Sequence, residues 1–514
     1  KITATAKSIT FPLCIKALKS DKNDFILKSF LFFYSNLFLY IFILYKGSKT
    51  QRIKHDKIRD MNRIKAFFNE LHQLQTFAEL EYFLWPDKIS VLSFITLAFL
   101  MISPLYVLVH ILAPINNDPF TLLLNNMTRI DEWVTLLIQV GSIGLILGFV
   151  SLLHFLISSK KSFRKLILEY KEISFLSLFI LWATLSSLLN KDLSFIWMGA
   201  MVRQEGLYAY LMYAGIFALA LLIHYKKHIL FLFKLQISVA SILVLLSLVN
   251  IESINTFLNI NALSSVFFNQ NHFAYYLAIS SSISSHLYLE EKKIFYLISF
   301  SILVLGLCLN GSFGPFLALV VSFSLYIVFL YKFKKERKQE ILIIYGVFVV
   351  VVLITNLFTH SFLNDLLRLG HDVNDIVNVS ENAGSAGSAR WQLWQNALKF
   401  ISQKPLLGYG IDNLGQAYAK VKLAMDRPHN EFLQFAASMG LPALVFYLSA
   451  LGSIFIKWVK QIQSASLYKI ALFFIALTYV ISSFFGNTMI YTFPYYVVIL
   501  ALLIKALTST DENG

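Results

Sequence analysis

Residues 341–357 of this chain read Ile-Leu-Ile-Ile-Tyr-Gly-Val-Phe-Val-Val-Val-Val-Leu-Ile-Thr-Asn-Leu and contain no charged side chain. An α-helix of this length approaches the thickness of the hydrocarbon core of a bilayer, about 30 Å. Comparable runs recur along most of the 514 residues, of which 57% are hydrophobic and only 14% are charged. Soluble domains have about 25% charged residues. The sequence therefore predicts an all-α fold, a polytopic membrane helix bundle.

The hydrophobic runs also predict how the chain is organised. One run, at about 25–45, stands apart near the N-terminus, and twelve more begin at residue 89. We predict that residues 89–514 form a transmembrane core of about twelve helices. The twelve runs lie at about 89–113, 134–158, 173–189, 207–225, 229–249, 272–289, 294–309, 315–331, 341–357, 431–456, 468–485 and 494–508.

Residues 1–88 are expected to form a basic N-terminal appendage. If the run at 25–45 crossed the membrane, four lysines would lie outside, against the preference of lysine for cytoplasmic loops: Lys7, Lys16, Lys19 and Lys22. An extra membrane helix and an interfacial helix therefore both stay open for this run.

The distribution of basic residues predicts the topology. The net charge of +15 would suggest nucleic acid in a soluble protein, but here the lysines and arginines cluster in short loops such as 160–165, 292–293 and 332–338. Such clusters are typical of cytoplasmic loops, so nucleic acid is not an expected partner. The alternation of spans then places a long polar segment, 358–430, on the external side. A segment of this length is too long for a connector and is the expected place for function.

The external loop is expected to contain two helices. Trp391, Trp394, Leu398 and Ile401 recur at helical spacing and predict a helix on the membrane surface. A second helix is expected after Asp412, which would cap it.

Three residues that carry or accept charge stand at predicted external ends of spans. Arg203 lies in Arg-Gln-Glu-Gly at 203–206, Arg390 precedes two tryptophans, and His429 lies in Arg-Pro-His-Asn at 427–430. Charge near a bilayer is costly, so each is a functional candidate. A guanidinium suits phosphate oxygens, and a histidine with a pKa near 6.5 accepts protons at physiological pH. Together they suit group transfer from a phosphorylated lipid.

Each candidate also has a purely structural alternative. Arg203 would pair with Glu205, Arg390 would reach lipid headgroups from an interfacial helix, and His429 would bond the backbone at a helix entry.

Other chemistries find less support in the spacing of residues. Gly408-Tyr-Gly410 is followed by Asn413 and no strand precedes it, so neither a dinucleotide fold nor a P-loop is indicated. We expect no cofactor and no metal. The loop does contain histidines and aspartates, which we interpret as a solvated cluster rather than a metal site: His360, Asp365, His371, Asp372 and Asp375.

The order of the motifs is more specific than any one of them. His429-Asn430 is followed, after nine residues, by Gly440. Three motifs precede this one: Arg-Gln-Glu-Gly at 203–206, Phe-Asn-Gln-Asn-His-Phe-Ala at 268–274, and Ser-Ala-Arg-Trp at 388–391 with Pro405, Gly408, Gly410 and Asn413. Over roughly residues 170–500, this order resembles the O-antigen ligase and polymerase superfamily of bacterial membrane glycosyltransferases.

The chain departs from the pattern of that superfamily at two places. Many members carry Ser-Arg-Gly where this chain reads Ser312-Phe313-Gly314, so a phosphate contact by an arginine is missing there. Ala443 replaces the usual Gly, Thr or Tyr three residues after Gly440, which we expect to affect only helix packing.

The resemblance implies a donor that carries a glycan on a polyprenyl diphosphate, and transfer of that glycan to an acceptor hydroxyl without a divalent metal. His429 would accept the hydroxyl proton, while Arg390 and Arg203 would stabilise charge on the leaving diphosphate. The active site would face the periplasm or exterior from the bacterial cytoplasmic membrane. The motifs imply these substrate-binding residues: Arg427, Asn430, Asn271, His272, Trp391, Gly408 and Gly410.

Several functions stay open within and beside this resemblance. The acceptor would be lipid A core for a ligase, a growing O-antigen or capsule chain for a polymerase, or a protein hydroxyl for a protein O-oligosaccharyltransferase. The compact histidine motif favours the ligase. A transporter of lipid-linked oligosaccharides fits twelve spans equally well, but charges gathered at one external face favour chemistry.

Overall fold

The computed structural model describes residues 86–110, 119–158, 163–190, 193–201, 203–248, 264–267, 269–359, 361–378, 384, 386–387 and 389–509. All of them belong to a compact unit that spans Leu84–Gly514. The predicted run at 25–45 and nearly all of the predicted N-terminal appendage lie outside the described residues, as do His360, Phe268 and Ser388.

The regular elements of the described residues are helices, which confirms the predicted polytopic bundle. Within the described part of the chain, eight helices are long and apolar enough to cross a membrane, and three shorter helices are also apolar. The long ones are α5 (Asp87–His110), α6 (Pro119–Ser158), α8 (Lys171–Leu189), α11 (Lys226–Leu248), α15 (Phe313–Phe333), α16 (Lys338–Thr359) with the 3₁₀ turn before it, α21 (Leu441–Gln461) and α22 (Leu467–Ser482) with the 3₁₀ turn after it. The shorter ones are α10 (Leu207–Leu222), α14 (Ile294–Asn310) and α23 (Phe493–Thr508).

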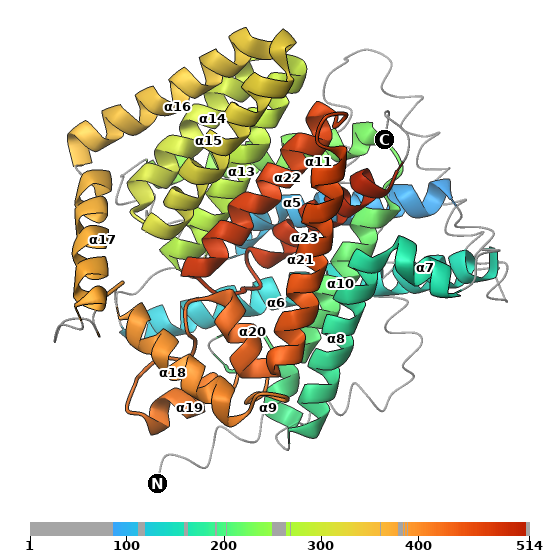
Figure 1. The fold of residues 1–514 in the computed structure, drawn as a ribbon, viewed down its shortest axis with the longest axis vertical. Helices are drawn as coiled ribbons and strands as arrows, with labels where there is room; N and C mark the ends of the chain where they lie inside the picture. The colour runs from blue at the N-terminus through green and yellow to red at the C-terminus, as the bar shows by residue number, and fades with distance from the viewer. Residues whose placement is uncertain are drawn as a thin grey trace. The chain divides into compact units, whose positions relative to one another are not determined.

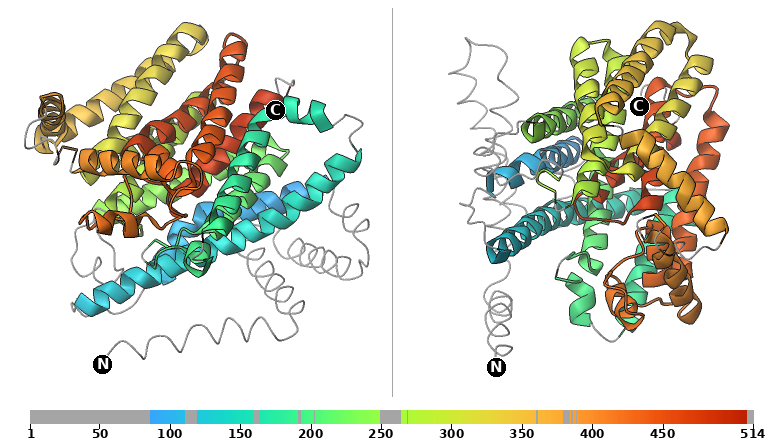
Figure 2. Two further views of the ribbon diagram at one scale, coloured as in Figure 1. Left: turned by 60° about the horizontal axis from the view of Figure 1, so that its bottom comes forward. Right: turned by 90° about the vertical axis from the view of Figure 1, so that its left-hand side faces the viewer.

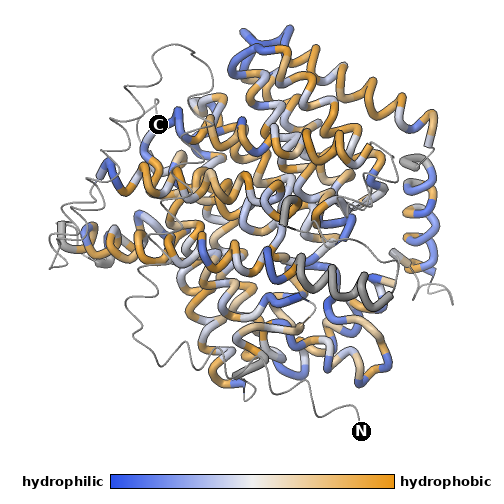
Figure 3. Tube along the Cα trace, turned by 180° about the vertical axis from the view of Figure 1, so that it is seen from behind, coloured by the Kyte–Doolittle hydropathy of each residue, from blue (hydrophilic) through white to orange (hydrophobic). Residues whose placement is uncertain are grey.

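With α13 (Gln270–Glu291), these helices match the twelve predicted runs. Hydrophobic residues predominate along them (Figure 3). The run predicted at 431–456 is wrong as a single helix, because it is broken at Gly440 into α20 (Glu431–Met439) and α21. Gly440 has φ +90°, and a side chain there would strike the carbonyl of Leu406 in the preceding loop.

Two helices form the centre of the bundle. α13 is buried from His272 to Leu289, and α23 is buried along nearly its whole length. α13 packs against α14 and α22, and α23 packs against α10 and α22 (Figure 1). Hydroxyl groups join three of the helices, since Thr478 Oγ1 lies 3.1 Å from Ser282 Oγ and 2.7 Å from Ser322 Oγ. Such interhelical bonds satisfy polar groups that lipid cannot.

Glycines bring α6 and α10 into backbone contact. A side chain at Gly144 would strike the Gly215 carbonyl, and one at Gly215 would strike the Gly141 carbonyl. Small residues at a helix interface permit this approach. The contact holds α10 next to the long helix α6 (Figure 2).

Short helices gather at one end of the bundle, the lower end in Figure 1: α9 (Leu193–Met198), α18 (Arg390–Gln403), α19 (Leu414–Lys420) and α20. α17 (Ser361–Val377) follows α16, and α7 (Phe163–Glu169) follows α6. Single 3₁₀ turns occupy Lys335–Arg337 and Ser483–Phe485.

The predicted helix of the external loop is present as α18, but its packing face differs from the prediction. Leu393, Ala397 and Phe400 are buried in a cluster with residues of α19 and α20, whereas Leu398 is 57% exposed. The second predicted helix is α19. Asp412 does not cap it, because the N-cap position is Asn413 and makes no side-chain capping bond.

Candidate active site

Arg427 is the buried centre of the region where four loops meet. Its Nη1 donates to Glu205 Oε2 at 2.6 Å and to the Thr488 carbonyl at 2.7 Å. Its Nη2 donates to Asp412 Oδ1 at 2.6 Å. The side chains of Arg427, Glu205 and Asp412 are at most 1% exposed. One guanidinium therefore ties together the loops before α10, before α19, before α20 and before α23.

Asp412 has an unusual backbone conformation, which its side-chain hydrogen bonds account for. Its φ is +56°, which costs energy for a residue with a side chain. In this conformation Oδ2 accepts from the Ala200 amide at 2.7 Å and the Glu205 amide at 3.4 Å, while Oδ1 accepts from Arg427. The carboxylate predicted as a helix cap is instead a link to the loop that carries Arg203.

Arg203 pairs with Asp426 rather than with its neighbour Glu205. Nε donates to Asp426 Oδ2 at 2.6 Å and an Nη donates to Oδ1 at 3.3 Å, a bidentate pair. Burial raises the pKa of the Asp426 carboxyl, but the charges of Arg203 and Arg427 outweigh it and hold that pKa at about 2. Asp426 is therefore ionised at neutral pH.

His429 lies at the end of the same loop, with φ +51°. The Trp394 indole donates to the Pro428 carbonyl at 2.9 Å, and Asn430 Oδ1 accepts from the Leu433 amide at 3.0 Å and so caps α20. Burial, followed by the charges of Arg390 and Arg203, lowers the pKa of His429 to about 4. The imidazole is therefore neutral at pH 7 and can accept a proton.

Arg390 is the first residue of α18 and is half-buried. Burial lowers its pKa, but a guanidinium stays charged at neutral pH. Among the residues that the structure describes, no carboxylate pairs with Arg390. Its charge acts on His429 and on Tyr275 of α13, so both lie close to it. Arg390 is thus a cation available to an anionic ligand beside a neutral histidine.

Of the other predicted substrate-binding residues, one is buried and two are half-buried at the starts of helices. His272 is buried, stacks on Tyr491 with ring centroids 5.1 Å apart, and lies within the field of Arg203 and His429. Asn271, whose Nδ2 donates to Asn269 Oδ1 at 3.1 Å, and Trp391 are half-buried at the starts of α13 and α18.

Gly408 and Gly410 allow the backbone to turn and to approach α20 closely. Both have positive φ, +64° and +98°. A side chain at Gly408 would strike the backbone of Ser438, and the Gly410 amide donates to the Ser438 carbonyl at 2.8 Å. These contacts lay the loop before α19 along α20, which carries His429 and Asn430 at its entry.

Sequence reasoning missed the residues, distant in the sequence, that contact the candidate site residues. Asp426, Asn487, Thr488 and Tyr491 each contact one of the candidates, and the last three lie in the loop before α23. Polar residues in a short break between two hydrophobic runs gave no signal beyond the break itself. The pairing of Asp426 with a residue 223 positions away leaves no local trace in the sequence.

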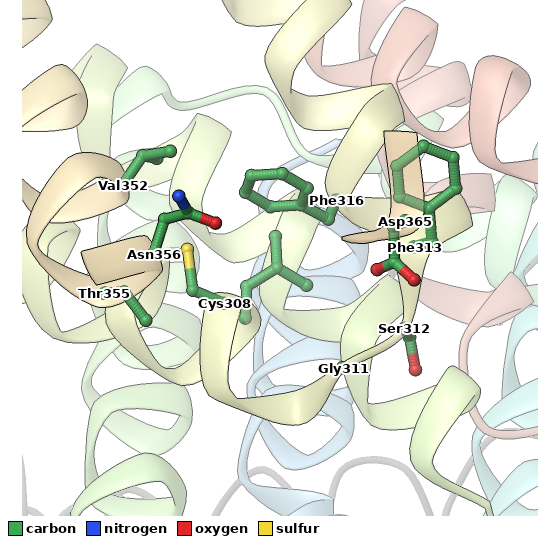
Figure 4. A pocket seen from close by; sticks show the side chains of 10 residues that line it. Cys308, Gly311, Ser312, Phe313, Phe316, Val352, Thr355, Asn356 and Asp365 are labelled. Carbon is green, nitrogen blue, oxygen red and sulfur yellow. The ribbon is translucent and has the colours of Figure 1, made fainter. Parts of the chain in front are cut away.

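A small hollow lies between α14, α15, α16 and α17. In Figure 4 the side chains of Cys308, Phe316 and Asn356 face one another at one end, and Ser312 and Asp365 lie at the other. Neither Arg203 nor Arg390 nor His429 lines it, so it is separate from the arginine and histidine cluster. In the described part of the chain, no three His, Cys, Asp or Glu residues gather as metal ligands.

Residues 298–448 match a family model described as O-antigen ligase. This match supports the resemblance of the chain to the O-antigen ligase and polymerase superfamily. The matched segment contains Arg390 and His429, whereas Arg203 and Asn487 reach the same site from outside it.

One curated relative is similar in sequence to part of the chain. An uncharacterized protein of Haemophilus influenzae is 24% identical over 220 residues, which is 40% of this chain and 54% of that protein. The chain thus spans about half the length of this relative.

Proposed function

We propose that this protein transfers a glycan from a polyprenyl diphosphate carrier to an acceptor hydroxyl at the outer face of the bacterial cytoplasmic membrane, as an O-antigen ligase does. The observation that carries the proposal is the position of a neutral His429 beside Arg390, whose charge no described carboxylate compensates. The superfamily match supports glycan transfer in general.

His429 serves as the general base in the proposed reaction. The acceptor oxygen attacks the anomeric carbon of the donor, and its proton passes to the imidazole. A new bond forms from the anomeric carbon to the acceptor oxygen as the bond to the diphosphate oxygen breaks. The polyprenyl diphosphate leaves with the electron pair, and attack from the opposite face inverts the anomeric centre. A base of this kind contributes about 10² to 10⁴ in rate.

Arg390 and Arg203 stabilise the negative charge that grows on the diphosphate. A preorganised guanidinium is effective because it needs no reorganisation during the reaction. Arg390 carries the larger share, since Asp426 compensates part of the charge of Arg203. These arginines do the work for which other phosphate-transfer sites use a metal, so we propose that transfer is independent of divalent metal.

Arg427 acts on the site through its position rather than through contact with the donor. It is buried between Glu205 and Asp412, and His429 lies two residues further along the chain. By holding the loops that carry Arg203 and His429, it sets the distance between the base and the arginine.

Purified protein in lipid nanodiscs with a lipid-linked glycan donor tests the proposal. Mass spectrometry of the reducing end of the product distinguishes a lipid core, another repeat unit and a peptide hydroxyl. We expect transfer to lipid A core, and transfer that continues in EDTA. Donor moved across the bilayer without a covalent product would identify a transporter and overturn the proposal.

A further inference from the structure

Asn487 provides the hydrogen bond that the His429 ring makes within the described part of the chain. Its amide nitrogen lies 3.2 Å from His429 Nδ1. The amide oxygen of Asn487 is buried and has no hydrogen-bond partner among the described residues. Asn487 itself is only 8% exposed, so solvent has little access to either atom.

The nitrogen and the oxygen of this amide favour opposite positions of the ring proton on His429. If the nitrogen donates to Nδ1, the ring proton must lie on Nε2, and the ring has no free lone pair. If the amide turns by 180° about its last bond, the oxygen takes the same place and accepts a proton from Nδ1. The Nε2 lone pair is then free. In the first orientation the buried Asn487 oxygen lacks a donor among the described residues, a deficit of about 1–3 kcal/mol.

We propose that Asn487 is a positioning residue that accepts the Nδ1 proton of His429 and so leaves Nε2 as the atom that takes the acceptor's proton. This inference rests on the proposed function. It adds a residue that the histidine motif does not contain, from a loop 58 positions away.

The backbone around Asn487 is held in place on both sides. The Thr488 carbonyl accepts from Arg427, and the Phe484 carbonyl accepts from Asn430 Nδ2 at 3.3 Å. Between them, Gly486 packs so closely on the Tyr275 hydroxyl that a side chain there would collide with it. The amide of Asn487 therefore meets the imidazole from a rigid loop, as a partner that orients a base requires.

Asn487 can orient the ring without adding charge. The charged groups that face His429 are Arg390 on α18, Arg203 before α10, and Asp426 and Arg427 in its own loop. The titratable groups nearby on α13 are His272 and, beside Arg390, Tyr275. Burial, together with the three arginines, keeps the histidine neutral. A carboxylate at position 487 would oppose them, because it stabilises the imidazolium form.

The difference in charge between an amide and a carboxylate at position 487 provides a test, on full-length protein in nanodiscs. Asn487→Ala should lower kcat by roughly 10- to 100-fold, the range seen when an oriented imidazole loses its partner, with the KM for donor little changed. Asn487→Asp should restore part of kcat and move the acid limb of the pH profile upward by about one unit or more. Asn190→Asp, at the C-cap of α8, adds a carboxylate without touching His429 and should leave the profile unchanged.

Nitrogen-15 labelling of histidine gives a readout that does not depend on activity. The signal of His429, assigned by its loss in His429→Ala, should report a protonated Nδ1 and an unprotonated Nε2 in the wild type. A protonated Nε2, or an acid limb that Asn487→Asp leaves in place, would overturn the assignment to Asn487. If the wild type itself makes no glycan product, the proposed function fails instead.

Discussion

The guanidinium of Arg427 lies 2.6 Å from the carboxylate of Glu205, although 222 positions separate the two residues in the chain. Arg203 is likewise paired, with Asp426. Two of the three arginines around His429 thus have carboxylate partners, and the third, Arg390, has none among the described residues. The paired arginines hold the loops together, and we assign the unpaired one to the anionic donor.

Removing Arg427 should destabilise the protein. Arg427→Ala leaves two buried carboxylates, Glu205 and Asp412, without their partner, which costs about 3–5 kcal/mol. We expect a clearly lower midpoint of thermal unfolding in detergent, followed by tryptophan fluorescence. Lys399→Ala removes an exposed cation from α18 and should unfold like the wild type. Equal midpoints for both variants would show that the buried pairs do not hold the loops.

Arg390 should affect both binding and rate. Its charge faces the diphosphate before and during transfer, so Arg390→Ala should weaken donor binding and lower kcat together. Arg390→Lys should recover only part of each, because an ammonium lacks the bidentate fork. Donor affinity and single-turnover rate measure the two effects, with Lys399→Ala as the control for charge on α18. A variant with wild-type affinity would remove Arg390 from the donor site.

The helices of this protein could be predicted from sequence because their signal is local. Each of the twelve runs from residue 89 onward falls on one or two helices of the described residues, even in α13, whose buried residues include five serines between Ser280 and Ser285. The break at Gly440 was missed because its cause is not local. A carbonyl from Leu406 occupies the space that a side chain would need, and only the folded loop brings it there.

The candidate site was predictable in part. Residue chemistry singled out Arg203, Arg390 and His429, and the fold brings them within range of one another. Their partners were not predictable, since proximity in sequence favoured Glu205 for Arg203 while the fold supplies Asp426. The partner of His429 comes from a loop with no motif.

The depressed pKa of His429 predicts how transfer depends on pH. A base works in its neutral form, so activity is present above its pKa and is lost as the pH falls through it. With a pKa of about 4, rather than 6.5, kcat/KM should be nearly constant from pH 7 to 5 and should fall by half near pH 4. Melting temperatures at each pH control for unfolding. An acid limb near pH 6.5 would mean that the histidine is neither buried nor close to the arginines.

The lysine asymmetry predicts that residue 384 is external and residue 335 is cytoplasmic. In a variant with serine at Cys14 and Cys308, single cysteines at these positions can be labelled in intact cells with an impermeant maleimide. We expect labelling of Gly384→Cys and protection of Lys335→Cys. The reverse pattern would place the candidate site on the cytoplasmic side.

The central claim is that His429 is the base, and His429→Ala tests it most directly. The variant keeps Arg390 and Arg203, so binding of the lipid-linked donor should persist. The rate of glycan transfer should fall by roughly 10² or more. His429→Gln, which keeps the polar volume but accepts no proton at neutral pH, should be equally impaired. Transfer at a near-normal rate by His429→Ala would contradict the account and leave the histidine as a structural residue at the entry of α20.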